Sequence, residues 1–378
     1  NNIMNQLYFL LVLILLSTPQ IFSDQSKINT FDSDSTDIST TDYDGPYIIY
    51  RNGSTIIKQV LKNENGYYVK SDSISGHIKG KLITCNINDS VSFISIIKDT
   101  LINENSVYPM PEKLIAVSDI EGNFGAFRDF LINNKVINPD NQWIFGAGHL
   151  VLVGDFFDRG LNVTECLWFI YHLEQEAVKN GGYVHFILGN HEIMNMNDDI
   201  RYVRNKYFEN SRLMNEDYKD LYKQNTELGR WLETKNIIEK IGNYLFLHGG
   251  ISEELNMLNP AIEDINTKSR NYYYSSKAAR QSGDTLVSTV FRSKSSPFWY
   301  RGYVQETIRE DSLDLTLKLF DIDKIVVGHT IVDDVRYFYN GKVIAIDTDH
   351  AEGDTEGVFI EEGIAFRVDR YGNRNLLK

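Results

Sequence analysis

The sequence of 378 residues holds only two cysteines, Cys85 and Cys166. This scarcity excludes a small scaffold that is held together by many disulfides. A chain of this length with 42% apolar residues can bury a sizeable core and needs no such bridges. Because Cys166 lies in the apolar run 166–170, we expect a buried free thiol there rather than a Cys85–Cys166 bridge.

Positive charge is also scarce. The 38 Lys and Arg residues are outnumbered by 52 Asp and Glu residues, which gives a formal net charge of −14. A uniformly acidic surface repels nucleic acids and anionic lipids, so we expect no nucleic acid as a stable partner. A local basic pocket remains compatible with this composition.

The N-terminal segment lacks basic residues over positions 1–6, and an apolar stretch follows at 7–16. That stretch has the length of a signal-peptide core and is too short to span a bilayer comfortably. Pro19 and Ser23 then provide a helix break and a small residue at a cleavage point. We expect a signal peptide over 1–23 and export to the periplasm or medium. An uncleaved membrane anchor and a buried terminal strand are the alternatives.

The remaining sequence divides by composition. Residues 24–42 are rich in Ser, Asp and Thr and predict a disordered linker. Residues 43–110 carry short β-branched and aromatic runs between turn signals, and predict a β-rich lead-in. From residue 111 to 378, strand-like and helix-like segments alternate, which predicts an α/β domain with helices on both outer faces of its sheet. The expected strands are 114–117, 150–153, 185–188, 244–247 and 324–327, and the expected helices are 124–131 and 163–178.

Two insertions and a β-rich end complete this domain. We expect a helical insertion at about 194–242 and a second insertion at 253–297. After His329, the runs 336–339, 342–346, 357–360 and 364–368 predict antiparallel strands.

Polar residues end the apolar runs of this domain, each with a glycine beside it, and in open α/β folds such strand ends carry the ligand site. Each residue has a plain structural reading: Asp119 as a helix cap, Asn190 as a turn residue, and the two histidines as core residues. Their joint occurrence indicates a two-metal phosphoesterase site instead. The residues are Asp119, Glu121, Asp155, Asn190, His248 and His329.

Hydrolysis of a phosphate ester can use two divalent ions that share a hydroxide and grip the phosphoryl oxygens. We expect Asp155 to bridge the ions, Asp119 and Glu121 to hold the first ion, and Asn190, His248 and His329 to hold the second.

The other polar residues of these segments receive roles in substrate binding and proton transfer. We expect His191 to be the general acid, oriented by Asp158. Arg159 and Arg301 are the candidate phosphate clamps, with Asn190 as a further substrate contact. A structural stacking role is the alternative for Arg301. Glu192 is expected to support the loop.

The segments 154–160, 189–192 and 248–250 resemble the calcineurin-like metallophosphoesterase superfamily, in its phosphoprotein phosphatase branch. The segments 229–232, 299–302 and 327–330 look like the bacterial Shewanella-like phosphatases. The resemblance begins at about residue 113 and implies a four-layer α/β/β/α sandwich of two mixed sheets. It also implies a dinuclear centre that hydrolyses phosphate monoesters, either phosphoseryl, phosphothreonyl or phosphotyrosyl groups of proteins or small phosphate esters. The site roles then fall on the residues named above.

The sequence departs from that family at Glu121, where the family has His, and at Ser118, where it has Gly. A carboxylate at 121 favours hard ions, so we expect manganese, with iron, zinc or magnesium as alternatives. Ile331 occupies a position that supplies a further ligand in other branches, which leaves the first ion few protein ligands. A nucleotide or dinucleotide phosphodiesterase and a catalytically silent metal-binding module remain as alternative functions.

Overall fold

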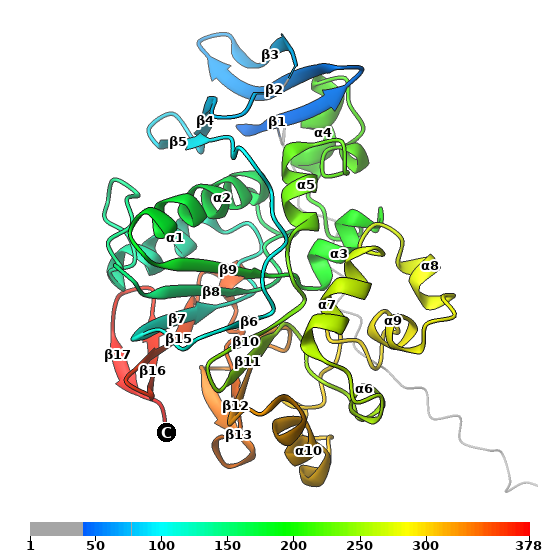
Figure 1. The fold of residues 1–378 in the computed structure, drawn as a ribbon. Coiled ribbons are helices and arrows are strands. Elements are labelled where there is room, and N and C mark those ends of the chain that lie inside the picture. Colours follow the sequence, from blue (N-terminus) through cyan, green and yellow to red (C-terminus); the bar gives the residue numbers. More distant parts are fainter. Residues whose placement is uncertain (1–40, 77) are drawn as a thin grey trace, which may run out of the picture. The chain divides into compact units, whose positions relative to one another are not determined.

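The computed structural model describes residues 41–76 and 78–378. The predicted signal peptide and nearly all of the predicted linker lie outside these residues. Two six-stranded sheets face each other in the unit formed by residues 40–378 (Figure 1). In the described part of the chain, no helix is long and apolar enough to cross a membrane.

The first sheet has the strand order β17-β16-β15-β7-β8-β9. β7, β8 and β9 run parallel, whereas β15 pairs antiparallel with both β7 and β16. The parallel strands are joined through helices, as a parallel arrangement requires. The bounds are β7 (Lys113–Val117), β8 (His149–Val153), β9 (Tyr183–Ile187), β15 (Glu356–Glu361), β16 (Ile364–Asp369) and β17 (Arg374–Leu376).

The second sheet has the order β13-β14-β12-β11-β10-β6. β11, β12 and β14 run parallel, and the hairpins β10–β11 and β13–β14 are antiparallel. Both sheets are therefore mixed, as expected. The bounds are β6 (Val107–Tyr108), β10 (Ile238–Ile241), β11 (Tyr244–Leu247), β12 (Lys324–Val327), β13 (Arg336–Phe338) and β14 (Val343–Ala345).

Side-chain alternation along the strands builds two cores. In β7, Leu114 and Ala116 belong to the core between the sheets, whereas Ile115 and Val117 belong to the core under the helices. Successive strand residues point to opposite faces, so a strand that is covered on both faces reads as a continuous apolar run. This explains why these strands could be predicted from continuous apolar runs in the sequence.

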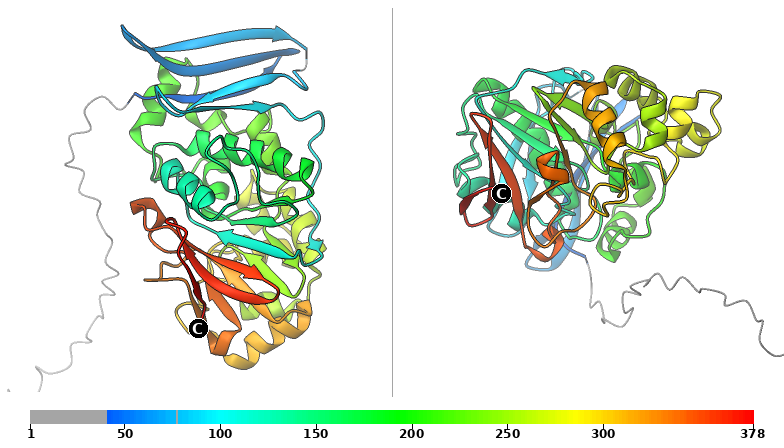
Figure 2. Two further views of the ribbon diagram at one scale, coloured as in Figure 1. Left: turned by 90° about the vertical axis from the view of Figure 1, so that its left-hand side faces the viewer. Right: turned by 90° about the horizontal axis from the view of Figure 1, so that it is seen from below.

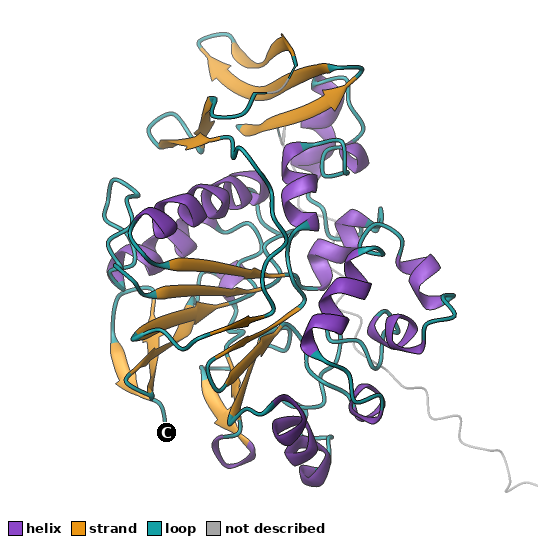
Figure 3. Ribbon diagram, viewed as in Figure 1, coloured by secondary structure: helices purple, strands orange, loops and turns teal. Residues whose placement is uncertain are grey.

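Helices cover the outer faces of both sheets and complete the four layers (Figure 3). α2 packs on β9, and α7 packs on β10. The Asn123 side chain caps α1 by accepting from the Ala126 amide at 3.1 Å, so Asp119 is not the cap. The bounds are α1 (Phe124–Asn133), α2 (Val163–Lys179), α3 (Asn190–Met196), α4 (Asn205–Leu213), α5 (Glu227–Glu233), α6 (Glu253–Met257), α7 (Ile262–Arg270), α8 (Ser276–Arg280), α9 (Thr285–Val290) and α10 (Glu310–Phe320), with short 3₁₀ turns at Tyr218–Asp220, Tyr339–Gly341 and His350–Glu352.

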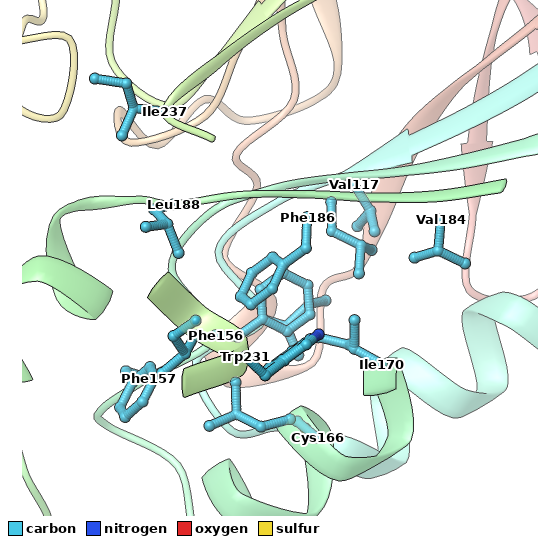
Figure 4. Close-up of a cluster of buried hydrophobic side chains, with 14 of the residues drawn as sticks. Val117, Phe156, Phe157, Cys166, Ile170, Val184, Phe186, Leu188, Trp231 and Ile237 are labelled. Atoms are coloured by element: carbon cyan, nitrogen blue, oxygen red, sulfur yellow. The ribbon is translucent and has the colours of Figure 1, made fainter. Parts of the chain in front are cut away.

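Large aromatic side chains fill the layer between α2, α5 and the first sheet (Figure 4). Trp231 of α5 stacks on Phe186 of β9 at 5.3 Å between ring centroids, and its indole nitrogen donates to Glu174 at 2.9 Å. Cys166 lies in the same cluster. Both cysteines are buried and free, as the sequence predicted.

The lead-in forms a three-stranded sheet and a hairpin that lie on the outer side of α2 (Figures 1 and 2). Tyr47 hydrogen-bonds Thr164 of α2 at 2.9 Å, and Trp168 donates to the Pro46 carbonyl at 2.7 Å. The lead-in therefore shares a core with the phosphoesterase-like layers rather than standing as a separate segment. The bounds are β1 (Asp44–Arg51), β2 (Ser54–Asn63), β3 (Gly66–Ser75), β4 (Leu82–Asn86) and β5 (Ser92–Ile96).

Two sequence-based boundaries need correction, whereas the antiparallel pairing predicted for runs 336–339 and 342–346 is confirmed. The predicted lead-in 43–110 includes β6, which is an edge strand of the second sheet. The predicted helical insertion 194–242 ends at α5, because 238–241 form β10, whose buried Glu239 hydrogen-bonds His185 at 2.6 Å. The run 342–346 holds β14, which is antiparallel to β13 but parallel to its other neighbour β12.

The buried Glu165 on α2 can be used to test how completely the lead-in excludes water from this helix. Neither of its carboxylate oxygens has a hydrogen-bond partner within the described chain, and the Lys206 ammonium is 3.9 Å away. Burial raises the pKa of Glu165 to about 8. Because the unfolded chain ionises this group near 4.5, the stability that its proton confers is lost as pH rises from 4.5 toward 8.

We predict that Glu165→Gln becomes more stable relative to the unsubstituted protein as pH rises through that window, by at most about 1.4 kcal/mol per pH unit. Urea unfolding of both proteins at about pH 5 and about pH 8 measures the difference in unfolding free energy. A difference that does not change with pH would contradict this account of Glu165.

Candidate metal centre

The polar residues predicted from the sequence converge at one edge of the two sheets. They follow β7, β8, β9, β11 and β12 directly, and the carboxyl ends of these strands meet there. A cavity of about 250 Å³ opens at this edge. Its walls include Asp119, Glu121, Asp155, Arg159, Asn190, His191, Arg301 and His329. The two remaining predicted residues, His248 and Asp158, lie directly behind this wall and hydrogen-bond Asn190 and His191.

The backbone is left-handed at several of these positions. φ is 53° at Asp119, 59° at Asp155 and 67° at His329. Such conformations are unfavourable for residues with a Cβ and persist where the surrounding structure enforces them, most often at functional sites. Gly154 shows the close packing involved, since a Cβ there would lie 2.7 Å from the Gly189 backbone and 2.8 Å from the His248 ring.

The residues expected to hold the second ion form a compact set. Ligating atoms of Asp155, His248 and His329 lie within 4.8 Å of one another. His248 Nδ1 donates to the Val153 carbonyl at 2.8 Å, which leaves Nε2 facing Asp155 and the Asn190 amide oxygen, each at 3.0 Å. A histidine held by a backbone carbonyl in this way is the usual arrangement of a metal ligand.

An orphaned nitrogen supports the same conclusion. His329 Nε2 is buried and has no hydrogen-bond partner among the described residues. Burial and the neighbouring His248 and Arg301 lower the pKa of His329, so its imidazole is neutral and its lone pair is free to bind an ion. The donor set of carboxylate, amide and neutral imidazole therefore fits a divalent metal ion.

The residues expected to hold the first ion are arranged less simply. Glu121, Asp155 and His191 bring ligating atoms within 4.8 Å of one another. Asp119 lines the same cavity but belongs to neither compact set of the described chain, and its Oδ2 accepts from the His329 amide at 3.1 Å. Burial raises the pKa of Asp119 to about 6.

Glu121 forms an ion pair with Arg159, one of the two predicted phosphate clamps. The Arg159 guanidinium also lies over the Tyr202 ring, 5.3 Å from its centroid. A carboxylate and a phosphate bind the same face of a guanidinium fork. Glu121 therefore competes with an incoming phosphate for Arg159, an interaction that the family histidine could not make as a neutral ring.

His191 and Asp158 adopt the arrangement expected of a general acid and its orienting partner. His191 Nδ1 lies 2.5 Å from Asp158 Oδ2, and Asn195 donates to the other Asp158 oxygen at 3.0 Å. Burial opposes the charged form of His191, but Asp155 and Asp158 outweigh it and raise the pKa of the ring. His191 Nε2 lies 3.8 Å from Asp155, so a proton on it faces the cavity.

Arg301 is the second residue predicted to bind phosphate. The residues that directly follow β12 hold its side chain in place. Its guanidinium donates to the His329 carbonyl at 2.6 Å and to the Thr330 hydroxyl at 3.2 Å. Burial lowers the pKa of Arg301. These contacts hold the guanidinium at the cavity wall.

Glu192 supports the site from behind, as expected. Its carboxylate accepts from the amides of Asp155 at 2.9 Å, Phe156 at 2.7 Å and Gly189 at 2.7 Å. One buried side chain therefore ties the turn after β8 to the start of α3.

The cavity also contains residues that the sequence did not single out: Tyr202, Trp299, Asp347, Asp349 and His350. Asp347 is the most informative of these, because it ends the apolar run after β14 in the same way that Asp119 ends β7. That pattern is visible in the sequence.

Comparison with known proteins supports the predicted resemblance to metallophosphoesterases. Residues 112–333 match the calcineurin-like phosphoesterase family. The chain is 25% identical over 298 residues to Shewanella-like protein phosphatase 2 of Arabidopsis thaliana, covering 66% of this chain and 74% of the relative. It is 29% identical over 230 residues to Shewanella-like protein phosphatase 1 of Plasmodium berghei, covering 58% of this chain and 61% of that relative, which is less than two thirds of its length.

A solved structure covers more of the chain. The cold-active protein-tyrosine phosphatase of a psychrophile Shewanella sp. superposes with a TM-score of 0.81 at 34% identity, covering 89% of this chain and 100% of that one. The similarity extends beyond the matched family region and includes most of the described residues.

Position 121 determines which ion the first position prefers. We predict that Glu121→His raises the affinity of the protein for Zn²⁺ relative to Mn²⁺, because imidazole suits zinc better than a carboxylate does. Competition between Mn²⁺ and Zn²⁺ for the metal-free protein measures the ratio of the two dissociation constants. The ratio should move toward zinc by about tenfold or more. An unchanged ratio would show that residue 121 does not bind the ion.

Proposed function

We propose that this chain, which belongs to the calcineurin-like phosphoesterase family, removes phosphate from phosphotyrosyl groups of proteins with manganese as its metal. The chain is a metal-dependent hydrolase of phosphate esters. The observation that carries the proposal is the His191–Asp158 pair beside Asp155 in a cavity with clamping arginines. Bound divalent ions supply a hydroxide nucleophile and neutralise the phosphoryl oxygens.

The side chains of the site divide the remaining work. Arg159 and Arg301 orient the phosphate with their guanidinium groups, which requires Arg159 to leave Glu121. His191 holds a proton at Nε2 and delivers it to the leaving oxygen, while Asp158 keeps the ring aligned through Nδ1. Developing negative charge on the leaving oxygen is thereby neutralised.

An aromatic wall favours an aryl leaving group. Tyr202 lies 5.2 Å from His191 between ring centroids, and Trp299 lies 5.7 Å from His329. Aromatic rings stack favourably on other aromatic rings, so a phosphotyrosyl ring can pack beside the proton donor. The protein-tyrosine phosphatase activity named for the Shewanella structure agrees with this substrate class.

The role of His191 can be tested through the leaving group. We predict that His191→Ala lowers the rate by about 10²–10⁴-fold for phenyl phosphate, whose leaving oxygen needs a proton. The loss should be much smaller for 4-nitrophenyl phosphate, because 4-nitrophenolate departs without one. Steady-state kinetics with both esters measure the two losses, and His172→Ala on α2, outside the cavity, is the control. Equal losses for the two esters would refute the assignment of His191 as general acid.

Substrate class needs its own comparison. Matched phosphotyrosyl and phosphoseryl peptides should differ in kcat/KM in favour of phosphotyrosine, and a bis-aryl phosphodiester should be hydrolysed slowly. A diester that outperforms both peptides would support the phosphodiesterase alternative instead. No hydrolysis of any ester with added Mn²⁺ would support the silent metal-binding alternative.

We also propose export, on the apolar run 7–16 and the small residue Ser23. Expression in a bacterial host should yield a mature protein that begins at residue 24, as measured by intact mass. Recovery of the uncut chain in the membrane fraction would support an anchor instead.

A further inference from the structure

Asp347 lies at the same sheet edge as the predicted ligands. β14 pairs parallel with β12, with Ala345 opposite Val327. Asp347 and His329 each follow two residues after this pair, so the register brings them to the same level. The Ile346 amide donates to the Val327 carbonyl at 2.9 Å, and the Val332 amide donates to the Asp347 carbonyl at 2.8 Å, which fixes the backbone there.

The Asp347 carboxylate is buried without a partner. The residue is 4% exposed and lines the cavity with Asp119 and Glu121. Within the described residues, no group donates a hydrogen bond to its carboxylate and no cation forms an ion pair with it. The other buried carboxylates of the site differ in this respect, since Asp158 is bound by His191 and Asn195. A buried carboxylate is costly unless it is paired or coordinates a metal.

Among the described residues, no cation forms an ion pair with Asp347. Arg301 is the charged side chain that acts on Asp347 most favourably after His248, but its guanidinium is engaged by the His329 carbonyl and the Thr330 hydroxyl. Arg159 is paired with Glu121. A bound divalent cation would therefore supply the partner that this carboxylate lacks.

We propose that Asp347 is a ligand of the first divalent ion. The sequence predicts four ligands for the second position, Asp155, Asn190, His248 and His329, but for the first position only Asp119, Asp155 and a Glu121 that pairs with Arg159. Like Asp119, Asp347 lines the cavity outside the two compact sets of ligating atoms. Asp347 supplies the missing ligand as a hard oxygen donor, which favours manganese or magnesium. This inference rests on the proposed two-metal function. It adds a residue that follows β14 to the predicted ligands, which follow the other strands.

The test compares two neighbouring aspartates that line the same cavity. Asp347→Asn removes the proposed ligand, whereas Asp349→Asn removes an equal charge from an exposed side chain two residues on. Titration calorimetry of the metal-free proteins with MnCl₂ measures stoichiometry and affinity. We expect two sites in the unsubstituted protein and in the Asp349 variant. In the Asp347 variant one site should weaken by about tenfold or more while the other stays unchanged.

Thermal unfolding of the same proteins separates a metal ligand from a structural residue. Because the Asp347 side chain has no hydrogen-bond or ion-pair partner to lose among the described residues, the metal-free Asp347→Asn variant should be at least as stable as the unsubstituted protein and should gain less stability from Mn²⁺. A metal-free variant that is less stable would assign Asp347 a structural role and overturn the proposal. Asp347→Glu, which keeps the carboxylate, should bind Mn²⁺ better than the Asn variant; equal weakening would also count against the proposal.

The failures of the two proposals are distinguishable. Two Mn²⁺ sites of unchanged affinity in Asp347→Asn would overturn the role of Asp347 and leave the two-metal function intact. Absence of Mn²⁺ binding by the unsubstituted protein would overturn the two-metal function itself.

Discussion

Repulsion between buried carboxylates is the constraint on which the candidate site depends. Asp119, Glu121, Asp155 and Asp347 are all buried around one cavity of about 250 Å³. Burial first, and then repulsion from the neighbouring Asp119 and Asp155 carboxylates, raises the pKa of Asp347. Charges of one sign in a low-dielectric site are unfavourable unless a cation joins them. The buried carboxylates at this edge of the sheets therefore favour the binding of cations in the cavity.

The architecture concentrates these groups. Parallel strands of both sheets end at the same edge, so residues far apart in the chain reach one cavity. Left-handed backbone at Asp119, Asp155 and His329 then turns the chain sharply after each strand. Glu192 ties the turn at Asp155 to the start of α3 through three backbone amides. The outer helices and the lead-in bury the rest of the framework and keep these turns in place.

Glu121 distinguishes this site because its carboxylate forms an ion pair with Arg159. By pairing with Arg159 it links the first metal position to the phosphate clamp. An ion that draws Glu121 away would free the guanidinium for phosphate, so metal and phosphate binding are expected to favour each other.

Local sequence was enough to predict most of the fold and the wall of the site. Strands such as β11 and β12 are covered on both faces and therefore appear in the sequence as apolar runs. The polar residue that follows each run marks the end of the strand and so the candidate site. Partners that depend on long-range pairing could not be predicted. The contact of Glu121 with Arg159 depends on side-chain direction, and the role of the lead-in depends on contacts such as that between Tyr47 and Thr164. The place of Asp347 in the cavity depends on the parallel pairing of β14 with β12, from which β13 separates it in the sequence.

The most direct measurement of the central claim is the dependence of the unfolding free energy on free Mn²⁺ concentration. A ligand that binds the folded state stabilises it in proportion to the logarithm of its concentration, with a slope set by the number of ions released on unfolding. The account predicts a slope of about two ions at saturating Mn²⁺. A slope near zero would contradict the claim that this edge of the sheets is built to hold two cations.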